Sequence, residues 1–315
     1  METPFIETKH LKKYFPTARG ALHAVDNVNL RIERGHTLGV VGESGCGKST
    51  LGRVILRLIE ATEGEILYNG ENIREYSPRV MEKMRRKMQI IFQDPYASLN
   101  PRMSVSEIIM EPMKVCHLYR TRSEMEEKVF DLMGTVGLAE RFVNSFPHEL
   151  DGGRRQRIGI ARALAVDPEF IVCDEPVSAL DVSIQAQILN LMMDLQEERK
   201  LTYLFITHDL SVVKHISDEI AVMYLGQCVE RAKTDDLFEH PMHPYTQALL
   251  DAIPVPKLNA KKKRKIIRGE VTSPVNPKPG CRFFGRCPYA SDACQAPLEL
   301  KEREPGHFVA CTLHQ

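Results

Sequence analysis

The segment from Gly42 to Thr50 constrains the fold of this chain more than any other part of its sequence. It fits the pattern G-x-x-x-x-G-K-[ST] with the residues Gly42, Glu43, Ser44, Gly45, Cys46, Gly47, Lys48, Ser49 and Thr50. Glycines let successive backbone N–H groups approach and cradle phosphates. An apolar run at 36–42 precedes the loop and helical spacing follows at 48–59, as in a strand, loop and helix N-terminus. We therefore predict a nucleotide-phosphate site, with Lys48 at the β- and γ-phosphates and Ser49 on Mg²⁺.

A pair of carboxylates at the end of a later apolar run is a second chemical signal. The run Phe170-Ile-Val-Cys ends on Asp174 and Glu175. Asp174 matches the carboxylate that orders Mg²⁺ and its waters, and Glu175 can polarise a water for in-line attack on the γ-phosphate. Acidic pairs at strand ends also cap helices, but a complete phosphate loop upstream favours the hydrolytic interpretation.

Composition and charge exclude several other classes of protein. Lys plus Arg and Asp plus Glu each total 42 in the 315 residues, so no global field favours nucleic acid as a partner. No apolar run reaches the roughly 18 residues that a membrane helix needs, and the N-terminus lacks the features of a secretory signal. We therefore expect the chain in the cytoplasm, or held by a partner at the cytoplasmic face of the cell membrane.

Apolar runs separated by helical patterns predict an α/β fold with a mostly parallel sheet covered on both faces. The expected strands lie at 36–42, 88–92, 169–174, 202–207 and 218–225, with a helix at 183–199. The stretch 103–165 is almost wholly helical, with segments beginning near Val105, Arg122 and Gly153. We therefore predict a helical subdomain over about 95–165, inside a nucleotide-binding domain of residues 1–255.

The amino-acid composition of the chain changes after Pro254. A basic run, KKKRK, occupies 261–265, and the proline-rich segment TSPVNPKPG follows. We predict a separate, small and cysteine-rich C-terminal extension over 256–315. The basic run is either a solvated linker or a contact with anionic lipid headgroups, which is worth about 1 kcal/mol per basic residue near the surface.

Five further segments, in chain order, resemble the nucleotide-binding subunit of ABC transporters. They are Tyr14 in LKKYF, Gln93 after IIF, Leu150-Asp-Gly-Gly-Arg154 before RQRIGIARAL, Ser178-Ala-Leu-Asp181, and His208 in FITHDL. Each alone has an ordinary interpretation, as a core aromatic, a loop amide, a helix cap or a structural histidine. Their joint order across 14–208 identifies the chain as a member of the family, with a P-loop ABC-type nucleotide-binding fold.

The resemblance implies ATP and Mg²⁺ and gives each segment a role. Tyr14 is similar to the aromatic that stacks on adenine, for which any ring face serves. Gln93 looks like the glutamine that joins Ser49 and Asp174 at the metal and links it to the membrane partner's coupling helix. His208 looks like the switch histidine that contacts the γ-phosphate. The implied catalytic set comprises Lys48, Gln93, Glu175 and His208.

The resemblance also implies partners. Two such subunits sandwich two ATP molecules, each between one chain's phosphate loop and the other's LSGGQ segment. Closing and reopening of this dimer drives two membrane permease subunits between inward- and outward-facing states. An extracytoplasmic solute-binding protein belongs to the same complex.

The chain departs from the family at the LSGGQ segment, where it reads LDGGR. Asp151, Gly152 and Gly153 would approach the partner's nucleotide, and the Asp151 carboxylate would repel its γ-phosphate. Two unit charges about 4 Å apart at an effective dielectric of about 20 repel by about 4 kcal/mol, an effect that Arg154 partly offsets. Alternatively, Asp151 turns aside and caps the helix that begins near Gly153. The first interpretation predicts an asymmetric heterodimer with a second ATPase subunit that supplies an intact LSGGQ.

The segment His243-Pro244-Tyr245 resembles the start of the C-terminal extension in the oligopeptide/dipeptide branch of ABC importers. Pro244 also suits the first turn of a short helix, which is the ordinary structural interpretation. Within transport the segment makes peptides the expected solute, with nickel, sugars or other solutes as alternatives. A soluble ABC ATPase acting on ribosomes or DNA usually has two cassettes or a long coiled-coil insertion, and this chain has neither. A small-molecule P-loop kinase is disfavoured by LDGGR, SALD and FITHDL together.

Cysteines crowd the end of the chain. In the oligopeptide branch, four cysteines of the extension bind an iron–sulfur cluster, and here they would be Cys281, Cys287, Cys294 and Cys311. We expect a [4Fe–4S] cluster, because the spacings lack the C-x₂₋₄-C pairs of zinc ribbons. Zinc and unligated thiols are the alternatives, with His307 or His314 as replacement ligands. In the phosphate loop, Cys46 is either a small packing residue or a thiol whose alkylation would block ATP.

Overall fold

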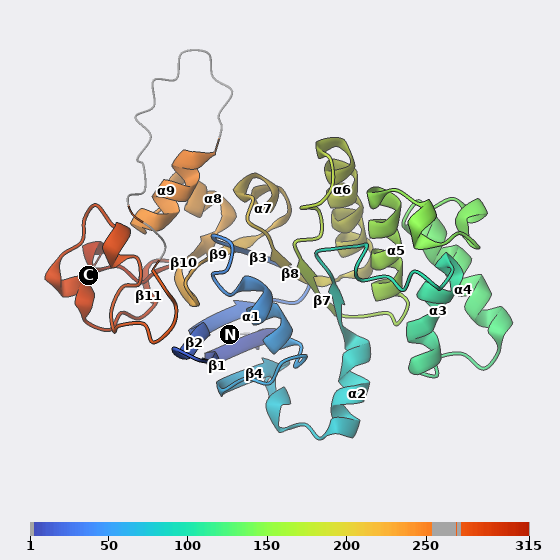
Figure 1. Cartoon of the computed structure of the whole chain (residues 1–315), viewed down its shortest axis with the longest axis horizontal. Helices are drawn as coiled ribbons and strands as arrows, with labels where there is room; N and C mark the ends of the chain where they lie inside the picture. Colours follow the sequence, from blue (N-terminus) through green and yellow to red (C-terminus); the bar gives the residue numbers. More distant parts are fainter. Residues whose placement is uncertain (1–2, 254–268, 270–271, 315) are drawn as a thin grey trace, which may run out of the picture. The chain divides into compact units, whose positions relative to one another are not determined.

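The structure is a computed structural model that describes residues 3–253, 269 and 272–314, in two compact units (Figure 1). Unit 1 comprises Met1–Ile32, Thr37–Arg74 and Thr207–Gln315, and unit 2 comprises Glu33–His36 and Glu75–Ile206. The chain passes from unit 1 to unit 2 within the short 3-10 helix η1 (Ile73–Glu75). The basic run at 261–265 and the expected boundary at 255–256 lie outside the described residues. Nowhere in the described ranges is a helix long and apolar enough to cross a membrane.

Unit 1 contains an antiparallel sheet that the sequence analysis did not predict. Its strand order is β2-β1-β4-β5. The bounds are β1 (Ile6–Thr17), β2 (Gly20–Ile32), β4 (Glu63–Tyr68) and β5 (Glu71–Asn72). The register of β1 on β2 shifts between Thr8 and Tyr14, so the two-residue alternation that marks a strand in sequence is interrupted. Charged and half-buried residues along both strands weaken the pattern further.

A second sheet of unit 1 carries the phosphate loop. Its strands run in the order β11-β12-β10-β9-β3. The bounds are β3 (Thr37–Val41), β9 (Glu219–Tyr224), β10 (Gln227–Lys233), β11 (Lys301–Glu304) and β12 (His307–Val309). Strands β3 and β9 are parallel, and the other neighbours are antiparallel. Every residue of β3 is buried, as expected for a strand covered on both faces.

Four α-helices lie in the described residues of unit 1. They are α1 (Lys48–Ile55), α7 (Leu210–Ile216), α8 (Thr234–Glu239) and α9 (Pro244–Ala252). Helix α1 ends at Ile55, before the limit of 59 that helical spacing predicted. Helix α9 begins at Pro244, so the expected short helix after the His-Pro-Tyr segment is confirmed.

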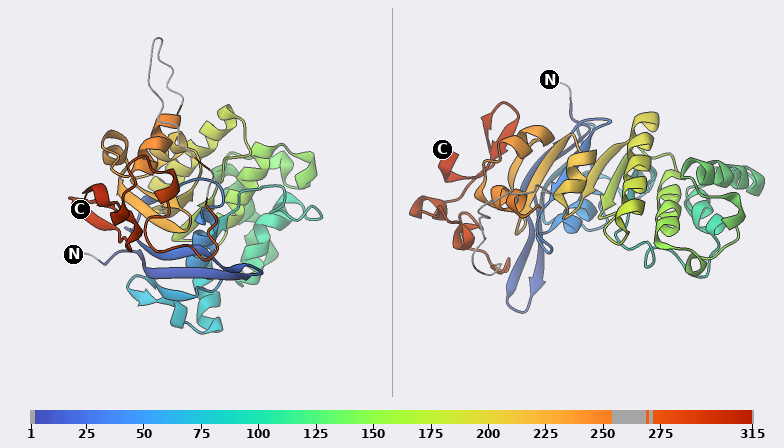
Figure 2. Two further views of the ribbon diagram at one scale, coloured as in Figure 1. Left: turned by 60° about the vertical axis from the view of Figure 1, so that its left-hand side comes forward. Right: turned by 90° about the horizontal axis from the view of Figure 1, so that it is seen from above.

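The structure gives no support for the separate C-terminal extension that we predicted, because its described part, residues 272–314, belongs to unit 1 and shares its core. This part contains β11, β12 and three 3-10 turns: η4 (Phe284–Arg286), η5 (Asp292–Gln295) and η6 (Thr312–His314). Strand β12 pairs with β10, and Phe283 packs in one buried cluster with Tyr224 and Tyr245. Figure 2 shows this red segment beside the blue β1–β2 hairpin, which it joins through a bridge between Leu22 and Val275. The extension therefore takes its apolar support from elements earlier in the chain.

Unit 2 has the parallel strands β8-β7-β6, hydrogen-bonded in that order, and five of the α-helices in the described part of the chain. Its strands are β6 (Met88–Ile91), β7 (Phe170–Asp174) and β8 (Thr202–Ile206). Its α-helices are α2 (Pro78–Lys87), α3 (Val105–Val115), α4 (Arg122–Thr135), α5 (Gly152–Leu164) and α6 (Val182–Arg199), with 3-10 turns η2 (Glu140–Phe142) and η3 (Pro147–Glu149). Capping boxes at Ser104 and Thr121 fix the starts of α3 and α4 where the sequence predicts them. Helix α2 was not predicted.

Candidate functional site

The phosphate loop needs glycine at defined positions. It leaves β3 after Val41 and enters α1 at Lys48. Gly42 and Gly47 have φ angles of 151° and 103°. A Cβ atom would lie 2.1 Å from the carbonyl oxygen of Met223 at the first position and 1.9 Å from that of Ala24 at the second. Only glycine fits these conformations and close approaches, so the sequence pattern has a direct steric cause.

The ammonium of Lys48 lies inside the loop. Its Nζ donates to the carbonyl oxygens of Gly42 at 2.7 Å and Glu43 at 3.0 Å, and the side chain is buried. Ser49 and Thr50 follow in the first turn of α1, which contains no acidic residue. Positive charge and helix N–H groups therefore gather at one place, which suits an anion.

The thiol of Cys46 is buried beneath the loop, 3.8 Å from the Lys48 ammonium. Burial raises the pKa of the Cys46 thiol, against the opposing influence of Lys48. A buried thiol with a raised pKa reacts slowly with alkylating reagents, because the thiolate is the nucleophile. Of the two sequence interpretations, the structure favours the small packing residue.

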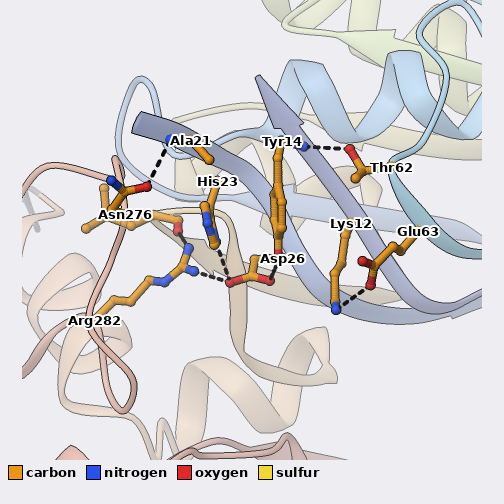
Figure 3. Close-up of polar contacts among 10 residues, drawn as sticks. Lys12, Tyr14, Ala21, His23, Asp26, Thr62, Glu63, Asn276 and Arg282 are labelled. Carbon is orange, nitrogen blue, oxygen red and sulfur yellow. Dashed lines mark hydrogen bonds and ion pairs between the residues drawn. The ribbon is translucent and has the colours of Figure 1, made fainter. Parts of the chain in front are cut away.

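Tyr14 lies on β1 beside two residues that the sequence analysis did not single out. Its hydroxyl donates to Oδ1 of Asp26 at 2.5 Å, and its ring stacks on His23 with centroids 3.8 Å apart (Figure 3). Burial and the Asp26 hydrogen bond raise the pKa of the Tyr14 hydroxyl. The ring is therefore held in one orientation, but its predicted contact with adenine stays a prediction.

Unit 2 brings together two of the residues predicted for hydrolysis. The side-chain amide of Gln93 donates to Oε2 of Glu175 at 2.9 Å. Asp174 is the last residue of β7 and is buried. Glu175 follows with a φ of 48°, a conformation that non-glycine residues adopt rarely and that recurs at functional sites. The backbone bend and the amide together fix the Glu175 carboxylate.

Asp151 caps α5 in the structure. Its Oδ1 accepts from the backbone N–H of Arg154 at 2.8 Å, and its Oδ2 pairs with the Arg154 guanidinium at 2.6 Å. This is the capping arrangement that we gave as the alternative, with the expected neutralisation by Arg154. Gly153 allows α5 to approach α6, because a Cβ there would lie 2.7 Å from Cγ2 of Ile184.

Two more predicted segments precede helices. Asp181, at the end of the SALD segment, caps α6 by accepting from the N–H of Ile184 at 3.0 Å. Ser178 in the same segment donates to the carbonyl oxygen of Glu175 at 3.1 Å. His208 is exposed and directly precedes Asp209, which caps α7. Polar residues after β7 and β8 thus cap helices or bond to nearby backbone, in addition to any role with nucleotide.

Comparisons with known proteins agree with these segments. Residues 25–178 match the family described as ABC transporter, and residues 229–294 match the oligopeptide/dipeptide transporter C-terminal region. The oligopeptide transport ATP-binding protein OppF of Bacillus subtilis is 53% identical over 313 residues, which cover 99% of this chain and 97% of that protein. The chain belongs to this family of ABC transporter ATP-binding proteins. It is therefore an ATP hydrolase that uses ATP and Mg²⁺.

Other relatives of this ABC ATPase support the same assignment. The oligopeptide transport ATP-binding protein AppF of Bacillus subtilis is 51% identical over 320 residues, covering 98% of this chain and 97% of that protein. Among solved structures, the dimeric bacterial ABC transporter cassette MJ0796 has a TM-score of 0.67 and 31% identity, covering 73% of this chain and 98% of its own. The cassette cbiO1 of Clostridium perfringens has a TM-score of 0.67 and 26% identity, covering 76% and 92%.

The four cysteines of the extension line one small cavity of the ABC ATPase, together with His243 and Thr312. All four thiols are free, and burial raises the pKa of Cys281 to about 11. Burial opposes ionisation of Cys294 too, but hydrogen bonds to Thr312 and Ser291 lower its pKa overall. In the described residues, no group of three or more ligating side chains stands close enough together to hold a metal ion.

Both histidines named as replacement ligands are engaged elsewhere. His307 is buried, and its Nε2 lies 2.8 Å from Oε1 of the buried Glu230. His314 contacts the carbonyl oxygen of Met242 through Nε2 at 3.0 Å. Neither residue lines the cysteine cavity. The structure therefore gives no support to either histidine as a replacement ligand.

Proposed function

We propose that this ABC ATPase powers the import of peptides through partner membrane permeases, at the cytoplasmic face of the cell membrane. The observation that carries the proposal is its near full-length similarity to oligopeptide transport ATP-binding proteins of Bacillus subtilis. The match of residues 229–294 to the oligopeptide/dipeptide transporter C-terminal region supports the same solute class. Two permease subunits and an extracytoplasmic solute-binding protein complete the proposed complex.

We assign the chemistry to the residues that the sequence motifs single out. The N–H groups of the phosphate loop and Lys48 hold the β- and γ-phosphates, and the ring of Tyr14 stacks on adenine. Gln93 orients the Glu175 carboxylate, which accepts a proton from the attacking water. His208 donates a hydrogen bond to the γ-phosphate. Meanwhile the water oxygen bonds to the γ-phosphorus, and negative charge moves onto the bridging oxygen that leaves with ADP. The helical segment 95–165 is the proposed subdomain that carries the LDGGR segment.

The donor set suits Mg²⁺. Oxygen ligands are those that this cation prefers, and the chain offers the Ser49 hydroxyl, the Gln93 amide oxygen and the buried Asp174 carboxylate. When bound, the cation would neutralise phosphate charge during hydrolysis. Burying an ionised carboxylate such as that of Asp174 costs free energy unless charged partners and hydrogen bonds offset it. A bound cation would be one such partner.

We further propose a heterodimer with a second ATPase subunit that supplies an intact LSGGQ. The Asp151–Arg154 pair supports a modified form of the charge argument, because the arginine offsets the carboxylate locally. What remains different from LSGGQ is the missing serine hydroxyl. Replacing Asp151 by Ser should raise turnover at the site facing this segment, whereas Glu175→Gln should stop turnover at the other site. Equal effects of both changes on both sites would contradict the asymmetry.

The cysteine cavity remains a candidate for an iron–sulfur cluster, with zinc as the second possibility. The convergence of four thiols supports the proposal, since thiolates are the ligands both groups require. The side chains would have to turn toward one another to bind it. Anaerobic purification followed by iron, sulfide and zinc analysis tests the proposal. Iron with sulfide supports the cluster, zinc alone replaces it, and neither would leave the thiols unligated.

Transport itself is tested by reconstituting the chain with its permeases and binding protein in liposomes. Uptake of a labelled oligopeptide should depend on ATP and should be lost in Lys48→Ala. Nickel and sugars serve as competing solutes in the same assay. Uptake of one of these in place of peptide would correct the solute class and leave the ATPase assignment intact.

A further inference from the structure

The C-terminal extension contacts the phosphate loop directly. The guanidinium of Arg286 makes two parallel hydrogen bonds to the carboxylate of Glu43, the second residue of the loop, at 2.8 and 3.1 Å. The backbone N–H of Glu43 donates to the hydroxyl of Tyr245 at 2.9 Å. Both the side chain and the backbone of Glu43 are therefore held by residues more than 200 positions later in the chain.

These contacts are well supported. The side chain of Arg286 is only 10% exposed and also donates to the hydroxyl of Tyr224 at 3.2 Å. Tyr245 is fully buried, with its ring 4.7 Å from Tyr224 and 5.4 Å from Phe283, measured between centroids. Paired charge-assisted hydrogen bonds with such restricted partners are stronger than exposed ion pairs. The position of Glu43 is thus determined from outside the loop.

A second arginine of the same segment, Arg282, is linked through Asp26 to Tyr14, the residue proposed to stack on adenine. Arg282 donates to the Asp26 carboxylate (Figure 3), and it also donates to the carbonyl oxygen of Leu225. The other oxygen of Asp26 accepts from the hydroxyl of Tyr14 at 2.5 Å. The Arg282 side chain is 5% exposed. A short chain of two contacts therefore joins the extension to the Tyr14 ring.

The extension is also anchored along the hairpin that carries Tyr14. Oδ1 of Asn276 accepts from the N–H of Ala21 at 2.9 Å (Figure 3). The N–H of His23 donates to the carbonyl oxygen of Pro274 at 3.0 Å. The N–H of Asn276 donates to the carbonyl oxygen of Ala21 at 2.9 Å. These bonds hold the extension in register with β2, so Arg282 meets Asp26 in a defined geometry.

We propose that Arg282 and Arg286 are positioning residues for ATP, Arg286 acting on the phosphate loop through Glu43 and Arg282 acting on Tyr14 through Asp26. The inference rests on the proposed roles of the phosphate loop and Tyr14 in binding nucleotide. A loop and a ring that are already ordered lose less conformational freedom when ATP binds, so affinity is higher. The two arginines serve different parts of the nucleotide, which separates their effects.

The test compares two probes on the full-length chain. Dissociation constants for MgATP and for magnesium tripolyphosphate, which lacks base and ribose, are measured by calorimetry. Arg286→Gln should raise both constants about tenfold, an energetic coupling of ordinary size. Arg282→Gln should raise the MgATP constant about tenfold and leave the tripolyphosphate constant within about twofold. Lys301→Gln is the matched control, because Lys301 is an exposed cation on β11 of the same extension.

A double change separates positioning from general loosening. Glu43→Gln combined with Arg286→Gln should bind no more weakly than either single variant, because both remove one contact. Arg286→Lys keeps the charge but loses the paired geometry, and its constants should lie between those of the wild type and Arg286→Gln. The Arg286→Lys variant also replaces Arg286→Gln in the test if the glutamine variant does not fold.

Three results would overturn the inference: unchanged constants in Arg286→Gln, equal weakening of both probes in Arg282→Gln, or full additivity in the double variant. Failure of the proposed function has a different signature. In that case the wild type would not bind MgATP, or Lys48→Ala would bind it as well as the wild type.

Discussion

At the scale of residues, the site depends on side chains whose partners fix one conformation. Glu175 has a positive φ and accepts from Gln93, so its carboxylate cannot turn freely. Asp151 has both carboxylate oxygens engaged by Arg154. These contacts lead to separate predictions, one for the rate of hydrolysis and one for stability.

Replacing Glu175 by Gln should lower the rate of ATP hydrolysis by about 100-fold or more, because proton transfer by a positioned carboxylate is lost. The affinity for MgATP should stay within a few-fold of the wild type, since the amide has nearly the same shape. Single-turnover hydrolysis and equilibrium binding measure the two quantities. A rate within threefold of the wild type would remove Glu175 from the catalytic set.

Replacing Asp151 by Ala should lower the free energy of unfolding by about 1 kcal/mol, the usual cost of losing an N-cap. Asp151→Ser should lose much less, because a serine hydroxyl also accepts from the helix N–H groups. Urea unfolding of both variants checks the difference. Equal stability of the alanine and serine variants would show that the cap contributes nothing measurable.

Sequence patterns single out Gln93, Glu175 and the loop glycines as candidates, but they do not predict the contacts around them. Motif order places Gln93 and Glu175 in the site, yet their hydrogen bond depends on the pairing of β6 with β7. Asp26 and Arg282 could not be predicted, because they lie far apart in sequence in segments without a pattern. Gly47 was predictable from the motif, but the close approach to the carbonyl oxygen of Ala24 that requires glycine there was not.

At the scale of elements, local signals decided what could be predicted. The starts of α3 and α4 follow from capping boxes, which involve residues three positions apart. The β1–β2 hairpin was missed because register shifts interrupt its alternation. The extension has short strands and 3-10 turns whose stability comes from β10 and the Tyr224–Tyr245–Phe283 cluster. The sequence of the extension alone therefore does not predict these strands and turns, because the residues that stabilise them lie elsewhere in the chain.

The His307–Glu230 pair should be essential to the attachment of β12 to β10. Glu230 is fully buried and also accepts from the N–H groups of Met242 and His243. His307→Ala removes one partner of a buried carboxylate, which should lower the free energy of unfolding by about 3 to 5 kcal/mol. His307→Gln retains a donor and should lose less. Denaturant unfolding would contradict this account if both variants matched the wild type.

Helix α9 should make stability depend on pH through its cap, His243. Burial lowers the pKa of His243 to about 4, from 6.5 for an ordinary histidine, so the folded state binds fewer protons than the unfolded state between these values. The stabilisation by His243 is complete above pH 6.5. It declines as pH falls toward 4, by about 1.4 kcal/mol per pH unit.

The matched control for this pH dependence is His243→Asn. Asparagine can accept from the N–H of Tyr245, as the His243 Nδ1 does, but it does not titrate in this range. The unfolding free energy of the wild type should therefore fall relative to that of the variant as pH falls from 6.5 toward 4. Parallel curves across this window would show that His243 is not the responsible group.

At the scale of the whole molecule, residues 272–314 contact the phosphate loop and Asp26, which are part of or beside the proposed nucleotide-binding residues. Phosphate loop, Tyr14 and extension all belong to unit 1, whereas Gln93, Asp174, Glu175 and LDGGR belong to unit 2. The fold class and the family could be predicted from sequence, because both rest on ordered motifs. The transported solute could not be predicted from these motifs, because none of the residues that they single out is expected to contact it.

The most direct test of the central claim is peptide transport by the reconstituted complex. ATP hydrolysis and uptake of a labelled oligopeptide are measured in the same liposomes, with wild-type chain and with Glu175→Gln. The account predicts that peptide-loaded binding protein stimulates hydrolysis and that Glu175→Gln abolishes uptake. Uptake that continues at the wild-type rate in Glu175→Gln, or hydrolysis that never responds to peptide, would contradict it.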